Sequence, residues 1–456
     1  MHSGVATEAR EIVIGTAHRY NWLNLGAAIN HPEAGKGFDI SPEVNRIAGI
    51  DDAWVRVLPN NGYGDAMQIR GLIAQEKPDA IFIFTDPRYW TWLFEIEREI
   101  RNKIPIIYNS IWDDYPAPLW NKPFYESCDL LMAISKQTHL IHQIVLGDVA
   151  KDKVLKYVPH GINENQFFPM TSVEQVETLS NFKKDLFKGK DIEFVAFWNS
   201  RNIRRKSPGD VILAYRMFCD SIGEEKAKKC ALVMHTQPVD ENGTDLLAVK
   251  EAICDESYVN VFFSADRLDT EQMNLLYNIA DVDLLISSNE GWGLSLTEAM
   301  MAGKMIIANV TGGMQDQMRF TDENGKWINF DSDFPSNHRG TYKECGKWAI
   351  PVFPSNISMV GSVPTPYIYD DRCSPEDVAK ALVTVYDLGK EERDRRGLLA
   401  REWVTSDESG MSARQMCTNV VQAMDECFDT FTPRSRFDLY KITDRPKKYI
   451  KHKLIY

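Results

Sequence analysis

Several features that define specialised classes of protein are absent from this sequence. None of its eight cysteines forms a CxxC pair, so neither a zinc cluster nor a redox dithiol is indicated, and scattered thiols are typical of a cytoplasmic protein. No apolar run approaches the ~20 residues that a membrane helix needs. The chain begins without a basic-then-apolar leader, and its net charge of −13 argues against a surface built throughout for nucleic acid or anionic lipid. We therefore expect a cytoplasmic protein without a signal peptide.

The remaining composition is ordinary for a globular protein, and a length of 456 residues predicts two or three domains. Short apolar runs alternate with segments of helical spacing, such as residues 65–76 and 92–102, a pattern typical of βαβ units. The expected strands form two series, at residues 12–14, 80–84, 104–108 and 130–134, and at residues 194–197, 231–234, 259–263, 282–286 and 305–308. The sequence therefore predicts an α/β fold with parallel sheets.

Breaks in this pattern divide the chain into three parts. A crossover with proline and glycine at residues 157–163 separates the two series of strands, so we predict an N-terminal domain over residues 1–165. A second domain is predicted over residues 166–415, with an insertion or long loop at residues 331–361. Helical spacing returns at Ser374, a good helix start. Residues 416–456 are predicted to form a C-terminal helix and a basic arm.

One segment combines a strand end, a glycine loop and a helix start. Glu290 ends an apolar strand, Gly291 and Gly293 let the backbone approach a ligand closely, and a helix opens near Ser295. The amides and positive dipole end of such a helix suit a diphosphate. Glu290 can reach sugar hydroxyls, and Glu298 can accept hydrogen bonds from a ribose. Alternatively, Ser295 and Glu298 form only a capping box, which would not explain Glu290 or the glycines.

A basic cluster follows the first strand of the second series, where ligands bind in such folds. Its members Arg201, Arg204, Arg205 and Lys206 can bracket a pyrophosphate, although a solvated basic loop is the alternative. We expect Arg201 and Lys206 to stabilise a leaving diphosphate without a metal ion. The Asp-x-Asp at residues 281–283 begins a buried strand, so no metal is expected there.

These motifs resemble those of a known family. The pattern from Glu290 to Glu298 resembles the E-x7-E signature of retaining GT-B glycosyltransferases, especially family 4, the glycosyl transferases group 1. Residues 312–316 resemble that family's loop with paired glycines, and residues 157–163 resemble its interdomain segment. The resemblance covers roughly residues 155–400. It implies two Rossmann-like, doubly wound domains that face a central cleft, with a C-terminal helix crossing back to the first domain.

The resemblance also implies roles for individual residues. Glu290 would contact the donor sugar and Glu298 the ribose, while amides around Leu294 would hold phosphate. The Arg and Lys spacing of the basic cluster resembles that of the family, and His235 lies where the family has a donor loop. The expected catalytic residues are Glu290, Arg201, Lys206 and His18, and the expected donor-binding residues are Gly15, Gly291, Trp292, Gly293, Leu294, Ser295, Glu298 and His235.

The N-terminal region offers weaker signals. Gly15 and His18 follow the first predicted strand and would face the cleft, although a lone histidine there is more often structural. Asp86, Trp112 and Asp113 lie in segments that follow other predicted strands and are candidates for orienting an acceptor. Aromatic rings in this region suit sugar stacking and core packing equally.

We predict an enzyme that transfers a sugar from a nucleoside-diphosphate sugar to an acceptor hydroxyl, with retained configuration and without a cofactor. The acceptor stays open between a glycan, a lipid-linked saccharide, a protein and a modified DNA base. The alternatives are a hydrolysing nucleotide-sugar epimerase of the same fold and a non-catalytic sugar-nucleotide-binding protein.

The tail at residues 441–456 holds six Lys or Arg, so it would suit an anionic partner or pack on the acidic body of the protein.

Overall fold

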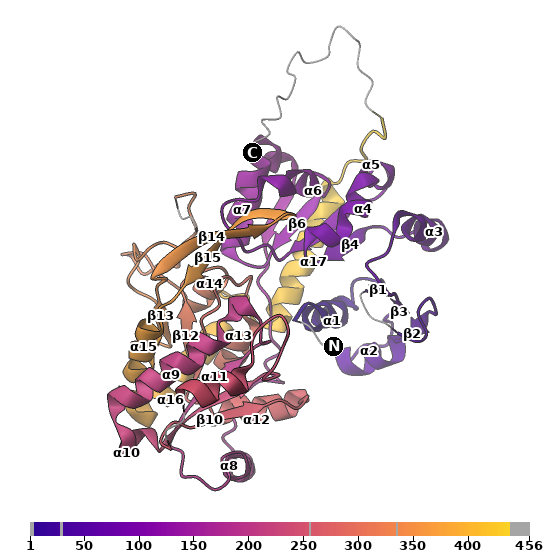
Figure 1. Cartoon of the computed structure of the whole chain (residues 1–456). Coiled ribbons are helices and arrows are strands. Elements are labelled where there is room, and N and C mark those ends of the chain that lie inside the picture. Colours follow the sequence, from indigo (N-terminus) through magenta and orange to yellow (C-terminus); the bar gives the residue numbers. More distant parts are fainter. Residues whose placement is uncertain (1–3, 28–30, 255–256, 334–335, 438–456) are drawn as a thin grey trace.

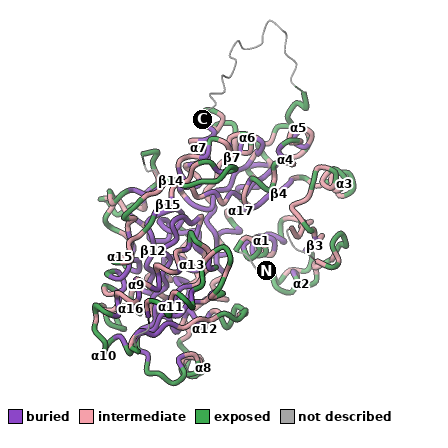
Figure 2. The backbone as a smooth tube through the Cα atoms, in the orientation of Figure 1, coloured by how far each residue is buried: buried purple, intermediate pink, exposed green. Residues whose placement is uncertain are grey.

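The computed structural model describes residues 4–27, 31–254, 257–333 and 336–437, which form two lobes (Figure 1). The basic arm predicted at residues 441–456 lies outside the described residues. Buried residues follow the strands in both lobes (Figure 2). None of the helices in the described part of the chain combines the length and apolar character that a membrane crossing needs.

The second domain is built on a parallel sheet with the strand order β10-β9-β8-β11-β12-β13. Its strands are β8 (Phe194–Asn199), β9 (Cys230–His235), β10 (Val261–Ser264), β11 (Val282–Leu285), β12 (Met305–Asn309) and β13 (Ala349–Val352). In chain order this is 3-2-1-4-5-6, the doubly wound arrangement whose switch point lies between the first and fourth strands. The second predicted series of strands is confirmed.

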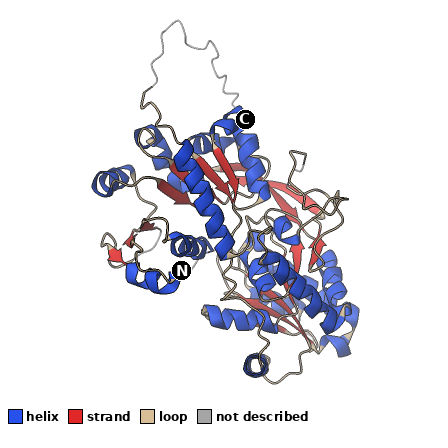
Figure 3. Ribbon diagram, turned by 180° about the vertical axis from the view of Figure 1, so that it is seen from behind, coloured by secondary structure: helices blue, strands red, loops and turns tan. Residues whose placement is uncertain are grey.

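Helices cover both faces of this sheet (Figure 3). They are α8 (Val173–Leu186), α9 (Pro208–Ile222), α10 (Glu224–Ala227), α11 (Leu246–Ile253), α12 (Thr270–Ile279), α13 (Leu294–Met301), α14 (Met314–Met318), α15 (Pro375–Asp387) and α16 (Gly389–Val404), with the 3-10 turn η4 (Arg204–Lys206). Along β8, Val195 and Phe197 face one core while Phe194, Ala196 and Trp198 face the other. Burial on both faces explains why these strands are continuous apolar runs.

The segment at residues 331–361 is not simply the predicted insertion or long loop. It contains β13, the edge strand of the sheet, and β14 (Asn356–Ser362), which pairs antiparallel with β15 (Thr365–Arg372). Pro351 made a strand less expected from the sequence, but an edge strand tolerates proline because one side needs no ladder hydrogen bonds. Beyond it, Ser374 caps α15, as predicted.

The first domain has a parallel sheet in chain order, β4 (Ile81–Phe84), β5 (Ile106–Ser110), β6 (Leu130–Ala133) and β7 (Val154–Tyr157). A separate small sheet has the order β1 (Trp22–Gly26), β3 (Val55–Pro59), β2 (Phe38–Asp39). The other elements are α2 (Ser41–Ala48), α3 (Ala66–Glu76), η1 (Pro87–Trp90), α4 (Thr91–Glu95), α5 (Glu97–Ile100), η2 (Leu119–Asn121), α6 (Lys122–Glu126), α7 (Lys136–Leu146) and η3 (Gly147–Asp152). The helix predicted at residues 65–76 is confirmed, whereas the one at residues 92–102 is divided at Ile96.

The predicted strand at residues 12–14 is wrong, because those residues lie in the helix α1 (Gly4–Thr16). This helix packs against α17 (Ala413–Thr430), which covers one face of the first domain's sheet. At Gly15 the two helices are so close that a Cβ atom would lie 2.3 Å from the Cys417 sulfur. Gly15 is therefore a helix-packing residue and does not form the glycine loop expected at a strand end. The apolar residues that suggested a strand, such as Ile12, bury one side of α1.

Candidate active site

The switch point of the second sheet brings two loops together. β8 and β11 are neighbours in the sheet, and ligands in such folds bind beyond the carboxyl ends of strands at this point. The loop after β8 carries Arg201 and Lys206, and the loop after β11 carries Glu290. The residues predicted to bind donor and diphosphate thus come from two adjacent strand ends.

Two cations contact Glu290. Lys206 Nζ forms a buried ion pair with Glu290 Oε2, and Arg205 Nη1 lies 3.3 Å from the same oxygen. Arg205 Nη1 also donates to the Asn289 carbonyl at 2.7 Å, and the Arg205 carbonyl accepts from the Ser288 amide at 2.8 Å. Burial lowers the pKa of Lys206 well below its usual range, and the nearby Arg205 charge lowers that pKa further. The two loops are therefore joined into one cationic site.

Arg201 does not contact Glu290. Its Nε lies 2.9 Å from Asp240 Oδ2, and its side chain is 52% exposed. Arg205 occupies the place beside Glu290 instead, because η4 turns Arg205 and Lys206 toward the β11 loop. Ser207 ends this turn with a φ of 51°, so it adopts the left-handed conformation that glycine favours.

Helix α13 begins directly after the glycine loop. Gly293 is its N-cap, with a φ of 89° that a side chain would strain, and Leu294 is the first helical residue. Within the described residues no side chain caps this N-terminus, and Ser295 lies inside the helix, which rules out the capping box. The first-turn amides and the helix dipole thus suit an anion. The Leu294 side chain lies against Gly4, so the start of α1 borders this position.

Glu298 lies one turn into α13 within a chain of hydrogen bonds. Its Oε2 accepts from the Tyr277 hydroxyl at 2.5 Å, and that hydroxyl accepts from Asn199 Nδ2 at 2.8 Å. Asn199 is the last residue of β8, so the carboxylate is oriented from the same strand that precedes the basic cluster. Burial raises the pKa of Glu298 to about 7. The charge of this carboxyl group therefore changes near neutral pH.

The other loop residues have structural contacts. Trp292 is buried in the core and its Nε1 lies 2.9 Å from Thr297 Oγ1, so the ring packs within the domain. The Gly313 amide donates to the Glu290 carbonyl at 3.0 Å. The paired-glycine loop therefore supports the backbone that carries Glu290.

The first domain meets this cluster with the loop after β5. Burial raises the pKa of Asp113 in that loop, while the charges of Arg205 and Lys206 in the other domain act to lower it. Gly291 lies against the same loop. Gln137 Nε2 donates to the Asp113 carbonyl at 2.6 Å and so fixes the loop from α7. The structure therefore brings Asp113 close to Arg205 and Lys206 of the second domain.

The other two acceptor candidates are engaged within the first domain. Trp112 is buried, donates from Nε1 to the Asp114 carbonyl at 3.0 Å and packs its ring against Trp120. Asp86 caps η1 and lies 2.6 Å from the Arg88 guanidinium. Both side chains therefore hold the first domain together.

The two predicted histidines differ in placement. His18 is exposed in the turn after α1, and its neighbours Arg19 and Tyr20 bind Asp425 of α17. It does not follow a strand, so the geometric reason for placing it at the donor is absent. His235 ends β9, where its Nδ1 lies 3.0 Å from Ser264 Oγ, and burial lowers its pKa.

The structure adds a buried group that the sequence did not indicate. Glu8 of α1 is fully buried, with Oε2 3.4 Å from His160 Nδ1 and 3.3 Å from the Gly161 amide in the interdomain segment. The His160 ring contacts Phe84 of the first domain and Trp292 of the second. Burial raises the pKa of Glu8 well above its usual range. Glu8 had no signal in the sequence, because a strand and not a helix was expected at residues 12–14 of α1.

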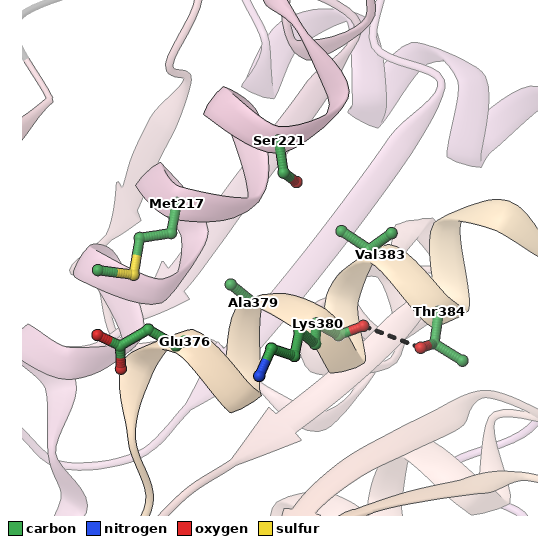
Figure 4. A pocket seen from close by; sticks show the side chains of 7 residues that line it. All are labelled: Met217, Ser221, Glu376, Ala379, Lys380, Val383 and Thr384. Carbon is green, nitrogen blue, oxygen red and sulfur yellow. Dashed lines mark hydrogen bonds between the residues drawn. The ribbon is translucent and has the colours of Figure 1, made fainter.

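A surface hollow lies elsewhere on the second domain, between α9 and α15 (Figure 4). It is lined by Met217, Ser221, Glu376, Ala379, Lys380, Val383 and Thr384. None of these is a predicted site residue. The chemistry indicated by the sequence thus lies at the switch point.

Comparison with known proteins relates the second domain to a known family. Residues 193–333, which include both loops of the switch point, match the family model described as glycosyl transferases group 1. This segment is a glycosyl transferases group 1 domain. The chain is also similar to mannosylfructose-phosphate synthase of Agrobacterium fabrum, with 23% identity over 192 residues. That match covers 42% of this chain and spans only 39% of the length of the curated relative.

Solved structures share the architecture of the whole chain. Sucrose-phosphate synthase from Thermosynechococcus elongatus has a TM-score of 0.62 at 15% identity, covering 94% of each chain. HepE of Anabaena, in complex with UDP and glucose, has a TM-score of 0.60 at 13% identity, covering 93% of this chain and 96% of its own. The trehalose-6-phosphate synthase of Burkholderia multivorans has a TM-score of 0.57 at 11% identity, covering 93% of this chain and 96% of its own. At such identities the likeness shows the fold, and the predicted GT-B fold is confirmed.

Proposed function

We propose that this chain is a glycosyltransferase that moves a sugar from a nucleoside-diphosphate sugar to a hydroxyl group of a saccharide, with retention of anomeric configuration. The observation that carries this proposal is the buried ion pair of Lys206 and Glu290 at the switch point, which the more exposed Arg205 also contacts, close to the N-terminus of α13. Cations and helix amides placed in this way can stabilise the charge that develops on a departing diphosphate.

Each part of the donor has groups suited to it. Without donor, Lys206 is paired with Glu290 and burial lowers its pKa, so an arriving diphosphate would favour the protonated amine. Glu290 would then be released toward the sugar hydroxyls, while Glu298 would accept from the ribose. The complex of HepE with UDP and glucose supports a UDP-sugar as the first donor to test.

The remaining features of the reaction are also proposals. Arg205 and Lys206 would supply the positive charge at the diphosphate, so we propose catalysis without a metal ion or other cofactor. Retention is proposed from the E-x7-E pattern, with the leaving phosphate helping to remove the acceptor's proton. The sucrose-phosphate synthase and trehalose-6-phosphate synthase neighbours favour a saccharide acceptor over a protein or a modified DNA base. A cytoplasmic location is proposed from the scattered cysteines.

Thermal unfolding with UDP-, GDP- and ADP-sugars tests the donor site. A ligand that binds only the native state stabilises it by about 2.7 kcal/mol when the ligand concentration is 100 times the dissociation constant. The sugars of one of the three nucleotides should therefore raise the melting temperature by a few degrees. Lys206→Ala should weaken that shift, whereas Arg201→Ala should preserve it, because Arg201 pairs with Asp240. If no nucleotide sugar or diphosphate raises the melting temperature of the wild-type protein, the proposal is wrong.

Turnover separates the enzymatic alternatives. With the donor and a panel of saccharides, NMR of the product should show an anomeric configuration equal to that of the donor. Rapid release of nucleotide and an epimerised sugar without acceptor would instead identify a hydrolysing epimerase. Binding without turnover, unaffected by Glu290→Ala, would identify a sugar-nucleotide-binding protein.

A further inference from the structure

The hairpin of β14 and β15 lies between the two halves of the site. It follows β13 and falls outside residues 193–333, the part that matches the family. In Figure 1 it extends from the second lobe toward β6 of the first. Ile368 and Tyr369 pack against the hydrophobic core of the first domain. The hairpin is therefore shared by both domains.

On the donor side, β15 is bonded to the residues directly before Glu290. The Asp371 amide donates to the Ser288 carbonyl at 2.9 Å, and the Ser288 hydroxyl donates to Asp370 Oδ1 at 3.0 Å. Asn289 Nδ2 donates to the Tyr369 carbonyl at 2.6 Å. Asn289 is buried, so these contacts fix the backbone that presents Glu290.

On the acceptor side, β15 holds the loop that carries Asp113. The Tyr369 amide donates to the Tyr115 carbonyl at 2.6 Å. Next to it, the Tyr367 ring meets the Trp120 ring edge-on, with centroids 4.4 Å apart. The amide and carbonyl of one residue, Tyr369, thus bond to the acceptor-side loop and to the donor-side loop respectively.

We propose that Tyr369 is a positioning residue whose main chain sets the distance between the loop at residues 112–116 and the segment that carries Glu290. The hairpin then orients the acceptor-side loop toward a donor already seated on the second domain. This inference rests on the proposed function, because it assigns the two loops to donor and acceptor.

A matched pair of substitutions isolates the single bond. Tyr369→Pro and Tyr369→Ala both remove the aromatic ring, but only proline removes the amide hydrogen that reaches Tyr115. The Tyr369 amide points to Tyr115, so the proline does not remove a bond of the hairpin ladder and should be tolerated as at an edge. The difference between the two variants therefore reports on the bond between domains.

Hydrogen exchange of the full chain measures the result, with UDP, GDP and ADP as probes. In wild type and Tyr369→Ala, the diphosphate that binds should protect peptides covering residues 286–296 and 109–121. In Tyr369→Pro, protection of residues 286–296 should remain, while residues 109–121 should exchange about fivefold to tenfold faster, in line with the loss of one net hydrogen bond. Equal exchange of residues 109–121 in the two variants would overturn the inference.

The controls distinguish this failure from others. If none of the three diphosphates protects residues 286–296 in wild type, the proposed function fails instead. A second pair covers the case in which Tyr369→Pro does not fold: Tyr367→Ala should loosen residues 109–121, and Tyr367→Phe, which keeps the ring against Trp120, should restore them. Loosening that is equal in Tyr367→Ala and Tyr367→Phe would contradict a role for this contact.

Discussion

The two domains differ in how their parts are distributed along the chain. The sheet of the second domain and the loops with Lys206 and Glu290 come from one continuous stretch, β8 to β13. The first domain is completed by α17, from the far end of the described chain, and its loop at residues 112–116 is held by a hairpin of the other domain. The half of the site that we propose to bind the donor, the donor half, is therefore local in sequence, whereas the proposed acceptor half depends on distant segments.

The largest expected effect is on the local, donor half. Lys206→Ala should lower kcat about 100- to 1000-fold, because it removes a buried cation from the leaving diphosphate. Arg201→Ala is the control and should change kcat less than about twofold, since its ion pair with Asp240 is exposed. Steady-state kinetics with the identified donor measures both. An equal loss of kcat in the two variants would mean that Arg201 also acts on the diphosphate, and it would contradict the arrangement around Glu290.

The contact of α1 with α17 can be tested at Gly15, near the end of α1. Gly15→Ala should lower the free energy of unfolding by about 1–3 kcal/mol, because its Cβ would collide with the Cys417 sulfur. The same change at Gly71, on an exposed face of α3 with open space around it, should raise that free energy by about 0.5–1 kcal/mol. Chemical denaturation compares the two. A stabilising Gly15→Ala would show that this packing is looser than described.

The pH dependence of donor binding should report Glu298. Burial raises the pKa of this carboxyl to about 7, so its ionised form, which accepts hydrogen bonds best, predominates above pH 7 and is lost below it. Affinity for the nucleotide sugar should fall up to about tenfold from pH 8 to pH 6. Calorimetric titration measures this fall, and Glu298→Gln should bind weakly but equally at both values. A wild-type affinity that rises toward pH 6 would exclude this role.

The smallest effect concerns the turn that presents Lys206. Ser207 has a φ of 51°, so Ser207→Gly should relieve backbone strain and raise the free energy of unfolding by about 0.5–1 kcal/mol. The melting temperature should rise slightly while kcat stays unchanged. A marked loss of activity would mean that the serine side chain, and not only its backbone, serves the donor half.

The donor half could be predicted because its signals are short-range. A buried parallel strand is an uninterrupted apolar run, and the polar residues after it must lie at the sheet edge, so Glu290 and Lys206 could be placed from their neighbours alone. The sequence could not show which arginine turns inward. Arg201 and Arg205 differ only through η4, a turn defined by contacts with the β11 loop.

In the half proposed to bind the acceptor, Asp113 was among the predicted residues, but most of the structure could not be predicted because its determinants are long-range. Residues 12–14 have the apolar character of a strand, yet they bury one side of a helix against α17. Trp112 is an aromatic residue on which a sugar ring could stack. In the structure it is a core residue, because it is buried against Trp120 and its Nε1 donates to the Asp114 carbonyl. The strand β15 lies between the predicted loop at residues 331–361 and the predicted helix start at Ser374, where the sequence indicated no strand.

The position of α17 has a consequence for the order in which the protein is made. The sheet face with Leu130 and Met132 is complete in the growing chain once β7 has emerged, but the helix that covers it ends at Thr430. Synthesis of the intervening residues takes on the order of tens of seconds. Throughout that interval the face stays apolar and uncovered, so the first domain to leave the ribosome is the last to be completed.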